Sequence, residues 1–512
     1  MYLRRRQSLR GPLRLPETVN SEILKSFIIL PWSASLLGYF VKFVMIGSIK
    51  SILPLTSLLF LYLPIQTNYK IDFNSIFTCY YIVELSFYMF YIYHKNLLSQ
   101  SKPTSDLYVY PPDRDRQLKL TNNNDPIKFL KNMLKHMDGV LGSNASSKDK
   151  QKALLDWFST STTHISAPKE WKEIRRDNLI EWLSWAFWSK PVSEINKLKS
   201  ATKDLEEMIK LIEIWTGEKI EEGRTEAVSM RLSIDEIRSE YHPIIHYLVT
   251  HVGCCTVGYI TLTLRGFERK KIGRMTYWVR RGSGNNEKCP IVFISGIGIG
   301  LVSYLKLYDR WIKEYPNRKI YLVDLPEYSL RFTTSVDILS PMERAESMTA
   351  MLGGRGAHFV GHSLGSVVIS WVMRLAPEGV VKAATFIDPV CFLLFHSSVA
   401  ANFVYRPPST PLDCLVSYFV AKELYVNNAL HRYFRWETNI LDPLMLKGIN
   451  TSVVLSDHDH FVPAQAVERH LNLEAERVRT RILREHSHAQ FCVMEGSCDV
   501  VLEEFREADV GC

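Results

Sequence analysis

The segment Gly361–Gly365, with the sequence GHSLG, constrains the fold more than any other part of this chain. The apolar run Ala357–Val360 precedes it and has the composition of a buried strand, and Ser366–Leu375 follows it with the length of an apolar helix. So short a turn forces strained backbone angles on the residue at its tip and exposes that side chain. Glycines on both sides let the neighbouring backbone pass without a Cβ clash. The pattern predicts a nucleophile at Ser363, with the N–H groups of the following helix directed at an oxyanion.

Strand-like and helix-like segments alternate around this turn. Buried strands are predicted at Pro290–Ser295, Lys319–Val323, Ala357–Val360, Ala383–Ile387 and Ser452–Leu455. The alternation predicts an α/β fold with a mostly parallel sheet and helices on both faces. Ligands bind such sheets at the carboxyl ends of the strands, which is where Gly296, Ser363 and the loop after Leu455 emerge.

The glycine-rich loop Gly296–Gly300 admits two interpretations. Its glycines are spaced G-x-G-x-G, and Leu301 stands where a dinucleotide-binding fingerprint needs its third glycine, so that interpretation fails. The other is a loop whose backbone N–H stabilises an oxyanion together with the N–H after the nucleophile. We expect Ile297 and Leu364 to supply these two groups.

A nucleophilic serine needs a base and an orienting acid, and the chain order Ser, Asp, His directs the search downstream of Ser363. Two polar stretches follow predicted strands, residues 456–463 (SDHDHFVP) and 484–491 (REHSHAQF). Side chains at the exits of neighbouring strands can meet there. The candidate bases are His486 and His488, and the candidate acids are Asp457 and Asp459.

Residues 285–505 resemble an α/β-hydrolase, a resemblance carried by Pro290–Leu301 and Gly361–Gly365. It implies a serine esterase or lipase whose acid often lies in a D-x-x-V-P pattern after the penultimate strand. Asp459–Pro463 matches that pattern, which favours Asp459 over Asp457.

The same resemblance places the base between the last strand and the final helix, which favours His488 over His486. Asp388 is the fallback acid, because some members carry it one strand earlier. The sequence departs from the family at Ser295, where the glycine loop often begins with histidine. A backbone donor survives that change.

An aromatic-rich insertion occupies residues 392–447, between the strand that precedes Asp388 and the strand Ser452–Leu455. Hydrolases of this family carry a helical lid at this position. A lid excludes water and shapes an acyl pocket. Whether it closes the site or only packs on the core, its composition suggests an apolar substrate.

The N-terminal region, residues 1–98, predicts a membrane anchor. Its apolar runs are Phe27–Gly47, Ile52–Ile65 and Ile76–Tyr93, and they follow an opening segment with five arginines before its first acid, Glu17. The first run is too long for a signal peptide. Lys42 and Glu84 favour the alternative of a soluble core. The number of spans stays open. The arginines favour a cytoplasmic N-terminus, and two spans would return the rest of the chain to the cytoplasm.

Residues 99–285 combine a polar linker with helix-like segments and offer no catalytic constellation. The tryptophan-rich segment Arg175–Trp188 fits either a membrane-surface helix or a helix packed on a core. Nine cysteines, odd in number and without a C-x-x-C pair, argue against a disulfide framework and a zinc site. The net charge of +8 comes without a basic block interleaved with aromatics, so nucleic-acid binding has little support.

The sequence therefore predicts a membrane-anchored serine hydrolase acting on lipid or other hydrophobic acyl esters. Its α/β-hydrolase domain is expected over residues 286–512, and no metal or organic cofactor is implied. The endoplasmic reticulum membrane with a cytoplasmic catalytic domain is the expected location, ahead of mitochondria. Three alternatives stay open: an inactive membrane scaffold with the same fold, an acyltransferase, and a hydrolase of thioesters or peptides that uses the same serine.

Overall fold

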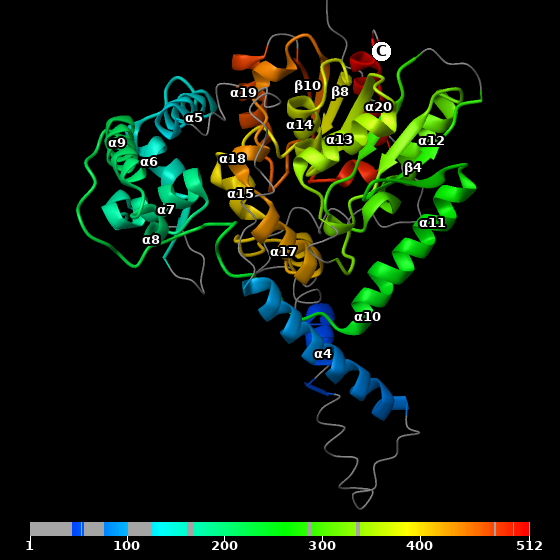
Figure 1. Cartoon of the computed structure of the whole chain (residues 1–512), viewed down its shortest axis with the longest axis horizontal. Coiled ribbons are helices and arrows are strands. Elements are labelled where there is room, and N and C mark those ends of the chain that lie inside the picture. The colour runs from blue at the N-terminus through cyan, green and yellow to red at the C-terminus, as the bar shows by residue number, and fades with distance from the viewer. Residues whose placement is uncertain are drawn as a thin grey trace, which may run out of the picture.

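The structure is a computed structural model, and it describes residues 44–52, 54–55, 76–100, 125–160, 168, 170–283, 288–333, 338–475, 478–494, 496–510 and 512. Within them, eight strands form one sheet in the order β10-β9-β8-β7-β5-β6-β4-β3. The strands are β3 (Glu268–Ile272), β4 (Met275–Arg280), β5 (Ile291–Ile294), β6 (Ile320–Val323), β7 (Ala357–His362), β8 (Val381–Ile387), β9 (Asn450–Ser456) and β10 (Val478–Leu483). Figure 1 shows this sheet beside a separate group of helices.

The sheet is mostly parallel, as predicted. All neighbours from β10 to β6 run parallel, while β4 pairs antiparallel with both β6 and β3. The sheet therefore begins at Glu268, which lies before the predicted start of this domain at residue 286. Strand β3 could not be predicted, because its residues ERKKI form an exposed edge strand rather than a buried apolar run.

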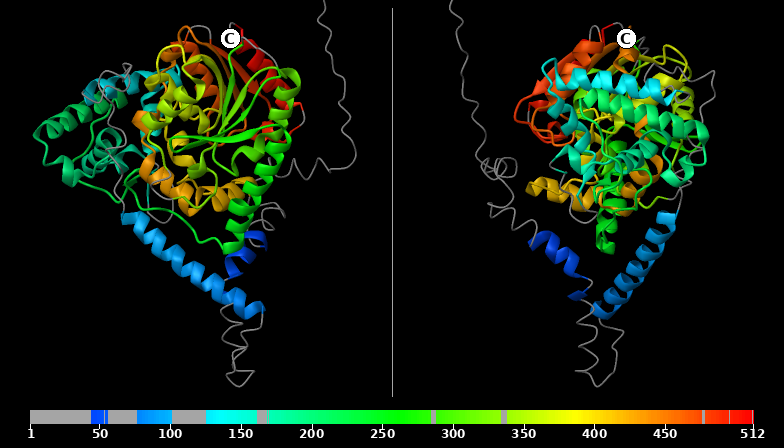
Figure 2. Two further views of the ribbon diagram at one scale, coloured as in Figure 1. Left: turned by 45° about the vertical axis from the view of Figure 1, so that its right-hand side comes forward. Right: turned by 90° about the vertical axis from the view of Figure 1, so that its left-hand side faces the viewer.

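Alternate residues of the central strands pack against helices on opposite faces of the sheet (Figure 2). In β5, Val292 and Ile294 join the core with α13 (Pro341–Leu352), α14 (Gly365–Leu375) and α19 (Ala464–Glu474). Ile291 and Phe293 point the other way, to α12 (Leu305–Glu314) and α20 (Ser497–Ala508). All four residues of β5 are buried, which explains its continuous apolar run.

A helical insertion lies between β8 and β9, at the position where a lid is expected from the sequence. It consists of α15 (Ser397–Asn402), α16 (Pro411–Val416), η8 (Ser417–Ala421), α17 (Leu424–Tyr433), α18 (Trp436–Asn439) and η9 (Pro443–Leu446). In Figure 1, α15 and α18 lie between the sheet and the helices of the middle region, and α17 lies below the sheet near α4.

The middle region forms a helical lobe beside the sheet (Figure 1). It contains α5 (Pro126–Leu141), α6 (Ser147–Leu155), α7 (Arg176–Trp188), α8 (Val192–Ile195) and α9 (Lys199–Thr216), with a small hairpin of β1 (Phe158–Ser159) and β2 (Val228–Ser229). Trp182 and Trp185 of α7 are buried, and the Trp185 indole donates to Ser233 Oγ at 2.8 Å. The tryptophan stripe is therefore part of a core, not a membrane-surface face.

Two apolar helices extend away from the sheet. The segment Ile76–Tyr93 lies within one helix, α4 (Ile76–Gln100). The second runs through α10 (Ile244–Tyr247), η4 (Leu248–Gly253) and α11 (Cys254–Leu264). Among the described residues, this 21-residue helix Ile244–Leu264 has the length and hydropathy of a membrane span. Most of Phe27–Gly47 and Ile52–Ile65 lies outside the described residues, so the expected N-terminal spans stay predictions.

The cysteine prediction is wrong for one pair. Cys289, just before β5, forms a disulfide with Cys512 at the C-terminus. Their sequence separation of 223 positions hides the pairing from any spacing rule. The chain end returns to the base of β5 because α20 packs across β8 and β9.

Candidate active site

The turn around Ser363 has the predicted form. Two residues, Ser363 and Leu364, separate β7 from α14, and Ser363 has a φ of 51°. A serine rarely adopts this left-handed conformation, so the turn stores strain that its surroundings must hold. Gly361 has no room for a side chain, because a Cβ there would lie 2.6 Å from Ile369 Cδ1. At Gly365 a Cβ would clash with the carbonyl oxygen of Ile294.

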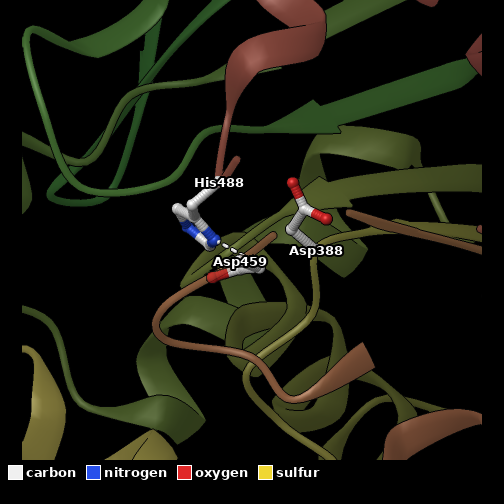
Figure 3. A group of neighbouring side chains, drawn as sticks. All are labelled: Asp388, Asp459 and His488. Atoms are coloured by element: carbon white, nitrogen blue, oxygen red, sulfur yellow. Dashed lines mark hydrogen bonds and ion pairs between the residues drawn. The ribbon is translucent and has the colours of Figure 1, made fainter. Parts of the chain in front are cut away.

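Three predicted residues meet at the carboxyl ends of the strands. Ser363 Oγ lies 2.9 Å from His488 Nε2, and His488 Nδ1 lies 2.5 Å from Asp459 Oδ2. Asp459 follows β9 and His488 follows β10, as the sequence order required. The other oxygen of Asp459 accepts the N–H groups of Phe461 and Val462, so the carboxylate is fixed before it meets the imidazole. Figure 3 shows the imidazole facing Asp459, with Asp388 beside the pair.

Asp388 forms no hydrogen bond with the His488 ring, whereas an orienting acid would form one. It directly follows β8, has a φ of 43° and is buried. Its carboxylate accepts Ser456 N–H at 2.8 Å, Ser456 Oγ–H at 3.0 Å and Ala489 N–H at 3.2 Å. None of these bonds reaches the His488 ring. Asp388 therefore holds the backbone on both sides of the Asp459–His488 pair.

The two carboxylates shape the electrostatics of the imidazole. Burial lowers the pKa of His488, but Asp459 and the more distant Asp388 outweigh it, so the His488 pKa is raised above its usual value. Burial, and then the Asp459 charge, raise the pKa of Asp388 to about 6. The site thus favours an imidazolium, which is the charge that a base acquires when it removes a serine proton.

His486 and Asp457 lie together but away from Ser363. His486 Nδ1 bonds to the Arg484 carbonyl at 2.7 Å, and its Nε2 meets Ser497 Oγ at 2.5 Å. Asp457 Oδ1 accepts the His486 N–H at 3.3 Å. The two residues shape the loop that carries His488, and the choice of Asp459 and His488 agrees with the geometry.

The glycine loop contains an amide that is free to bind an oxyanion. Gly296 N–H donates to Tyr304 Oη at 3.1 Å, and Gly298 N–H donates to the Tyr328 carbonyl at 3.0 Å. Among the described residues, the N–H between them, at Ile297, has no acceptor, and neither has that of Leu364. Both residues line the same cavity as Ser363. They are the pair expected to bind an oxyanion.

Tyr304 is a positioning residue that was not predicted from the sequence. Its hydroxyl accepts from Gly296 and lies 2.8 Å from His362 Nδ1, so it ties the glycine loop to the strand that carries Ser363. Burial and then repulsion by His488 hold the His362 pKa well below its usual value, so the ring is neutral. Its Nδ1 can therefore accept a hydrogen bond from the Tyr304 hydroxyl. No local sequence motif marks Tyr304, which ends the short helix η5 (Gly300–Tyr304).

An apolar cavity of about 440 Å³ opens beside Ser363. Its wall combines the glycine loop, the loop after β8 and the lid. The apolar lining includes Ile297, Leu394, Val399, Val404, Val416, Val420, Leu430 and Phe434. Asp413, His458 and His460 add polar groups, and among the described lining residues there is no lysine or arginine.

Asp388, Asp459 and His488 also carry donor atoms within 4.8 Å of one another, which is close enough for a metal ion. These donor atoms already take part in hydrogen bonds within the protein. The Asp388 oxygens accept two amides and a hydroxyl, and His488 Nδ1 faces Asp459. A cation would have to displace these donors, so the residues do not fit a metal centre.

The mostly parallel eight-stranded sheet and the strand–serine–helix turn fit the α/β-hydrolase fold. No protein-family description and no curated protein matches the chain.

Solved structures of α/β-hydrolase esterases and lipases are similar to about half of it. A membrane phospholipase A described as a bacterial virulence factor is 16% identical, with a TM-score of 0.37 over 52% of this chain and 94% of that one. A putative lipase from Acinetobacter baumannii is 15% identical, with a TM-score of 0.35 over 49% and 93%. Naproxen esterase from Bacillus subtilis is 14% identical, with a TM-score of 0.33 over 50% and 96%. At these values the fold rests on the strand order and the turn, not on the likeness.

Proposed function

We propose that this protein is a membrane-anchored serine hydrolase that cleaves lipid or other hydrophobic acyl esters. The observation that carries the proposal is the continuous path from Ser363 Oγ through His488 to Asp459, with distances of 2.9 and 2.5 Å. A serine with a bonded base and a fixed acid is an activated nucleophile, which favours an enzyme over an inactive scaffold.

The reaction follows from these positions. Ser363 Oγ attacks the ester carbonyl carbon while its proton passes to His488 Nε2, and Asp459 stabilises the imidazolium. The carbonyl oxygen becomes an oxyanion that the Ile297 and Leu364 N–H groups bind. When the C–O bond to the alcohol breaks, His488 returns the proton to the leaving oxygen. Water, deprotonated by His488, then attacks the acyl-enzyme, releasing the acid and restoring the Ser363 hydroxyl.

The cavity supports a neutral, apolar acyl ester as substrate. Its lining is mainly aliphatic, so burial of an acyl chain there is favourable by about 25 cal/mol per Å² of apolar surface. A phosphate or free carboxylate bound in the cavity would need a cationic partner, and the described lining offers neither lysine nor arginine. Carboxylic esters with a long acyl chain fit the lining of this cavity.

A series of umbelliferyl esters of increasing acyl length tests the proposal. The purified full chain in detergent should hydrolyse long-chain esters better than the acetate. Ser363→Ala should lower kcat/KM by at least about a thousandfold, because the triad acts as a unit. Ser347→Ala, on the outer helix α13, is the matched control and should retain activity. Hydrolysis that survives in Ser363→Ala would contradict the proposal.

A further inference from the structure

The helix Ile244–Leu264 has an outward face without a charged residue. None of its 21 residues is Asp, Glu, Lys or Arg. Its exposed large side chains are Ile245, Leu248, Val249, Val252, Val257, Tyr259, Ile260 and Leu264. A helix that meets water normally carries polar and charged residues on its outer face. This face is therefore built for an apolar environment.

The helix α4 adds a second exposed apolar face. Its exposed large side chains are Ile82, Val83, Leu85, Met89, Phe90, Tyr93 and Leu97. The two helices approach one another below the catalytic domain in Figure 1, and the views of Figure 2 agree. We call α4 and Ile244–Leu264 together the apolar helix pair.

Glu84 links the two helices. Its charge is the feature of α4 that favoured a soluble core over a membrane segment, and this charge is enclosed by the protein. The Glu84 side chain is fully buried. One carboxylate oxygen accepts the Ile244 N–H at 3.3 Å, and the other accepts the Tyr241 hydroxyl proton. A carboxylate at a helix N-terminus is favourably placed, because the helix dipole is positive there. The lipid penalty for a charged side chain does not apply to a carboxylate enclosed in this way.

Both ends of Ile244–Leu264 are held by the catalytic domain. Before the helix, Glu240 N–H donates to the Lys422 carbonyl of the lid at 2.9 Å. After it, Arg265 forms an ion pair with Asp309 of α12, with atoms at 2.7 Å. A helix whose two ends meet the same domain cannot carry the chain across a bilayer. Its apolar face can lie in the boundary between headgroups and acyl chains.

The lid connects the apolar helix pair to the cavity. The apolar helix Pro411–Ala421 lines the cavity with Leu412, Val416 and Val420. Its other side stacks on the start of Ile244–Leu264. The Tyr418 ring lies 4.5 Å from that of His242, and the Phe419 ring lies 5.8 Å from that of His246. One lid helix thus separates the acyl cavity from the apolar helix pair.

We propose that the apolar helix pair seats in one leaflet of a phospholipid bilayer and that the ester enters the cavity from that leaflet, past Pro411–Ala421. The uncharged length of the face, the enclosed Glu84 and the continuity with an apolar cavity select lipid as the occupant rather than a protein. The route of the ester rests on the proposed function, whereas the contact with lipid does not.

Lipid contact is measured without any activity. Ile260→Cys and Ile214→Cys place a thiol at sites that are 51% and 79% exposed, on Ile244–Leu264 and on α9. The full chain is reconstituted in vesicles of phosphatidylcholine with a minority of phosphatidylserine and treated with a bulky, membrane-impermeant maleimide. Mass spectrometry then reads modification at the introduced residue. We expect Ile214→Cys to react and Ile260→Cys to be protected. Equal reactivity would overturn the proposal and leave the face to a protein partner.

The route of the substrate is measured with two esters. Val249→Asp with Ile260→Asp should lower hydrolysis of umbelliferyl oleate in the same vesicles by about tenfold or more, because a charge on this face is costly in lipid. Hydrolysis of soluble umbelliferyl butyrate should be unchanged. The control pair, Ile214→Asp with Leu473→Asp, should change neither rate. An unchanged oleate rate, or an equal loss on both esters, would overturn the route. A wild-type enzyme inactive on both esters would refute the proposed function and leave the thiol measurement valid.

Discussion

The imidazole of His488 lies between two carboxylates with different tasks. Asp459 contacts the ring, and Asp388 braces the backbone at Ser456 and Ala489. Both negative charges favour the protonated ring, so its pKa is raised. A base must be neutral to accept the serine proton, and a raised pKa keeps the ring protonated to a higher pH. The acid limb of the activity profile should therefore lie above the usual histidine pKa of 6.5.

The substitution Asp388→Asn should move this acid limb to lower pH. It removes one negative charge that stabilises the imidazolium, and asparagine tolerates the positive φ of position 388. The measurement is kcat/KM against pH with a soluble short-chain ester. Asp457→Asn, whose carboxylate bonds to His486 instead, should leave the limb in place. A limb that stays or rises in Asp388→Asn would contradict this account.

The substitution Tyr304→Phe should lower kcat by about tenfold with little change in KM, because the Gly296 amide and His362 lose the hydroxyl that fixes the oxyanion loop. Tyr308→Phe is the matched control. The Tyr308 hydroxyl is buried one helical turn further on and has no hydrogen-bond partner among the described residues. A Tyr304→Phe enzyme as active as Tyr308→Phe would show that the loop does not depend on this hydroxyl.

At the scale of elements, the lid should set the acyl-chain length. Val420 of η8 faces the cavity of about 440 Å³. Val420→Phe adds a ring to that space, so the preference should move from long to short acyl esters. Butyrate hydrolysis serves as the internal control, because a short chain does not need the filled volume. The ratio of kcat/KM values for dodecanoate and butyrate measures the effect. An unchanged ratio would mean that the acyl chain lies elsewhere.

The sequence predicts elements well where burial is complete. Five predicted strands match β5 to β9 because these strands are buried on both faces and read as apolar runs. The charged edge strand β3 carries no such signal. The helix Ile244–Leu264 was overlooked although its lack of charge is visible in the sequence, because histidines, threonines and glycines dilute its hydropathy.

At the scale of the whole molecule, buried ionic contacts and a disulfide fix the C-terminus to the base of the sheet. Arg318 holds Asp509 with two bonds of 2.7 Å, and Asp509 also meets His358 Nδ1 at 2.8 Å. The Cys289–Cys512 disulfide lies at the same end of the chain. Because α20 follows the His488 loop, these contacts anchor the segment that delivers the base.

The substitution Arg318→Ala should lower the free energy of unfolding by about 3–5 kcal/mol, since the buried Asp509 carboxylate loses both guanidinium bonds and keeps its contact with His358. Arg506→Ala removes a comparable pair with Glu314 at the surface and should cost at most about 1 kcal/mol. Thermal unfolding in detergent compares the two variants. Similar losses of stability would contradict a buried anchor.

The parts of the candidate site that follow from local sequence patterns could be predicted. Ser363 and the glycine loop follow from strand-to-helix turns, and Asp459 and His488 follow from chain order. Tyr304 and the bracing role of Asp388 depend on contacts between segments far apart in sequence, which no spacing reveals. The Cys289–Cys512 pair escaped for the same reason.

Labelling with a fluorophosphonate probe measures whether Ser363 is an activated nucleophile, because the probe reacts with activated serines. Membranes containing the wild-type chain are compared with those containing Ser363→Ala or His488→Ala, and the modified peptide is identified by mass spectrometry. We expect the wild-type chain to be labelled at Ser363 and both variants to stay unlabelled. A wild-type chain that stays unlabelled, in detergent and in native membranes alike, would contradict it and favour an inactive scaffold.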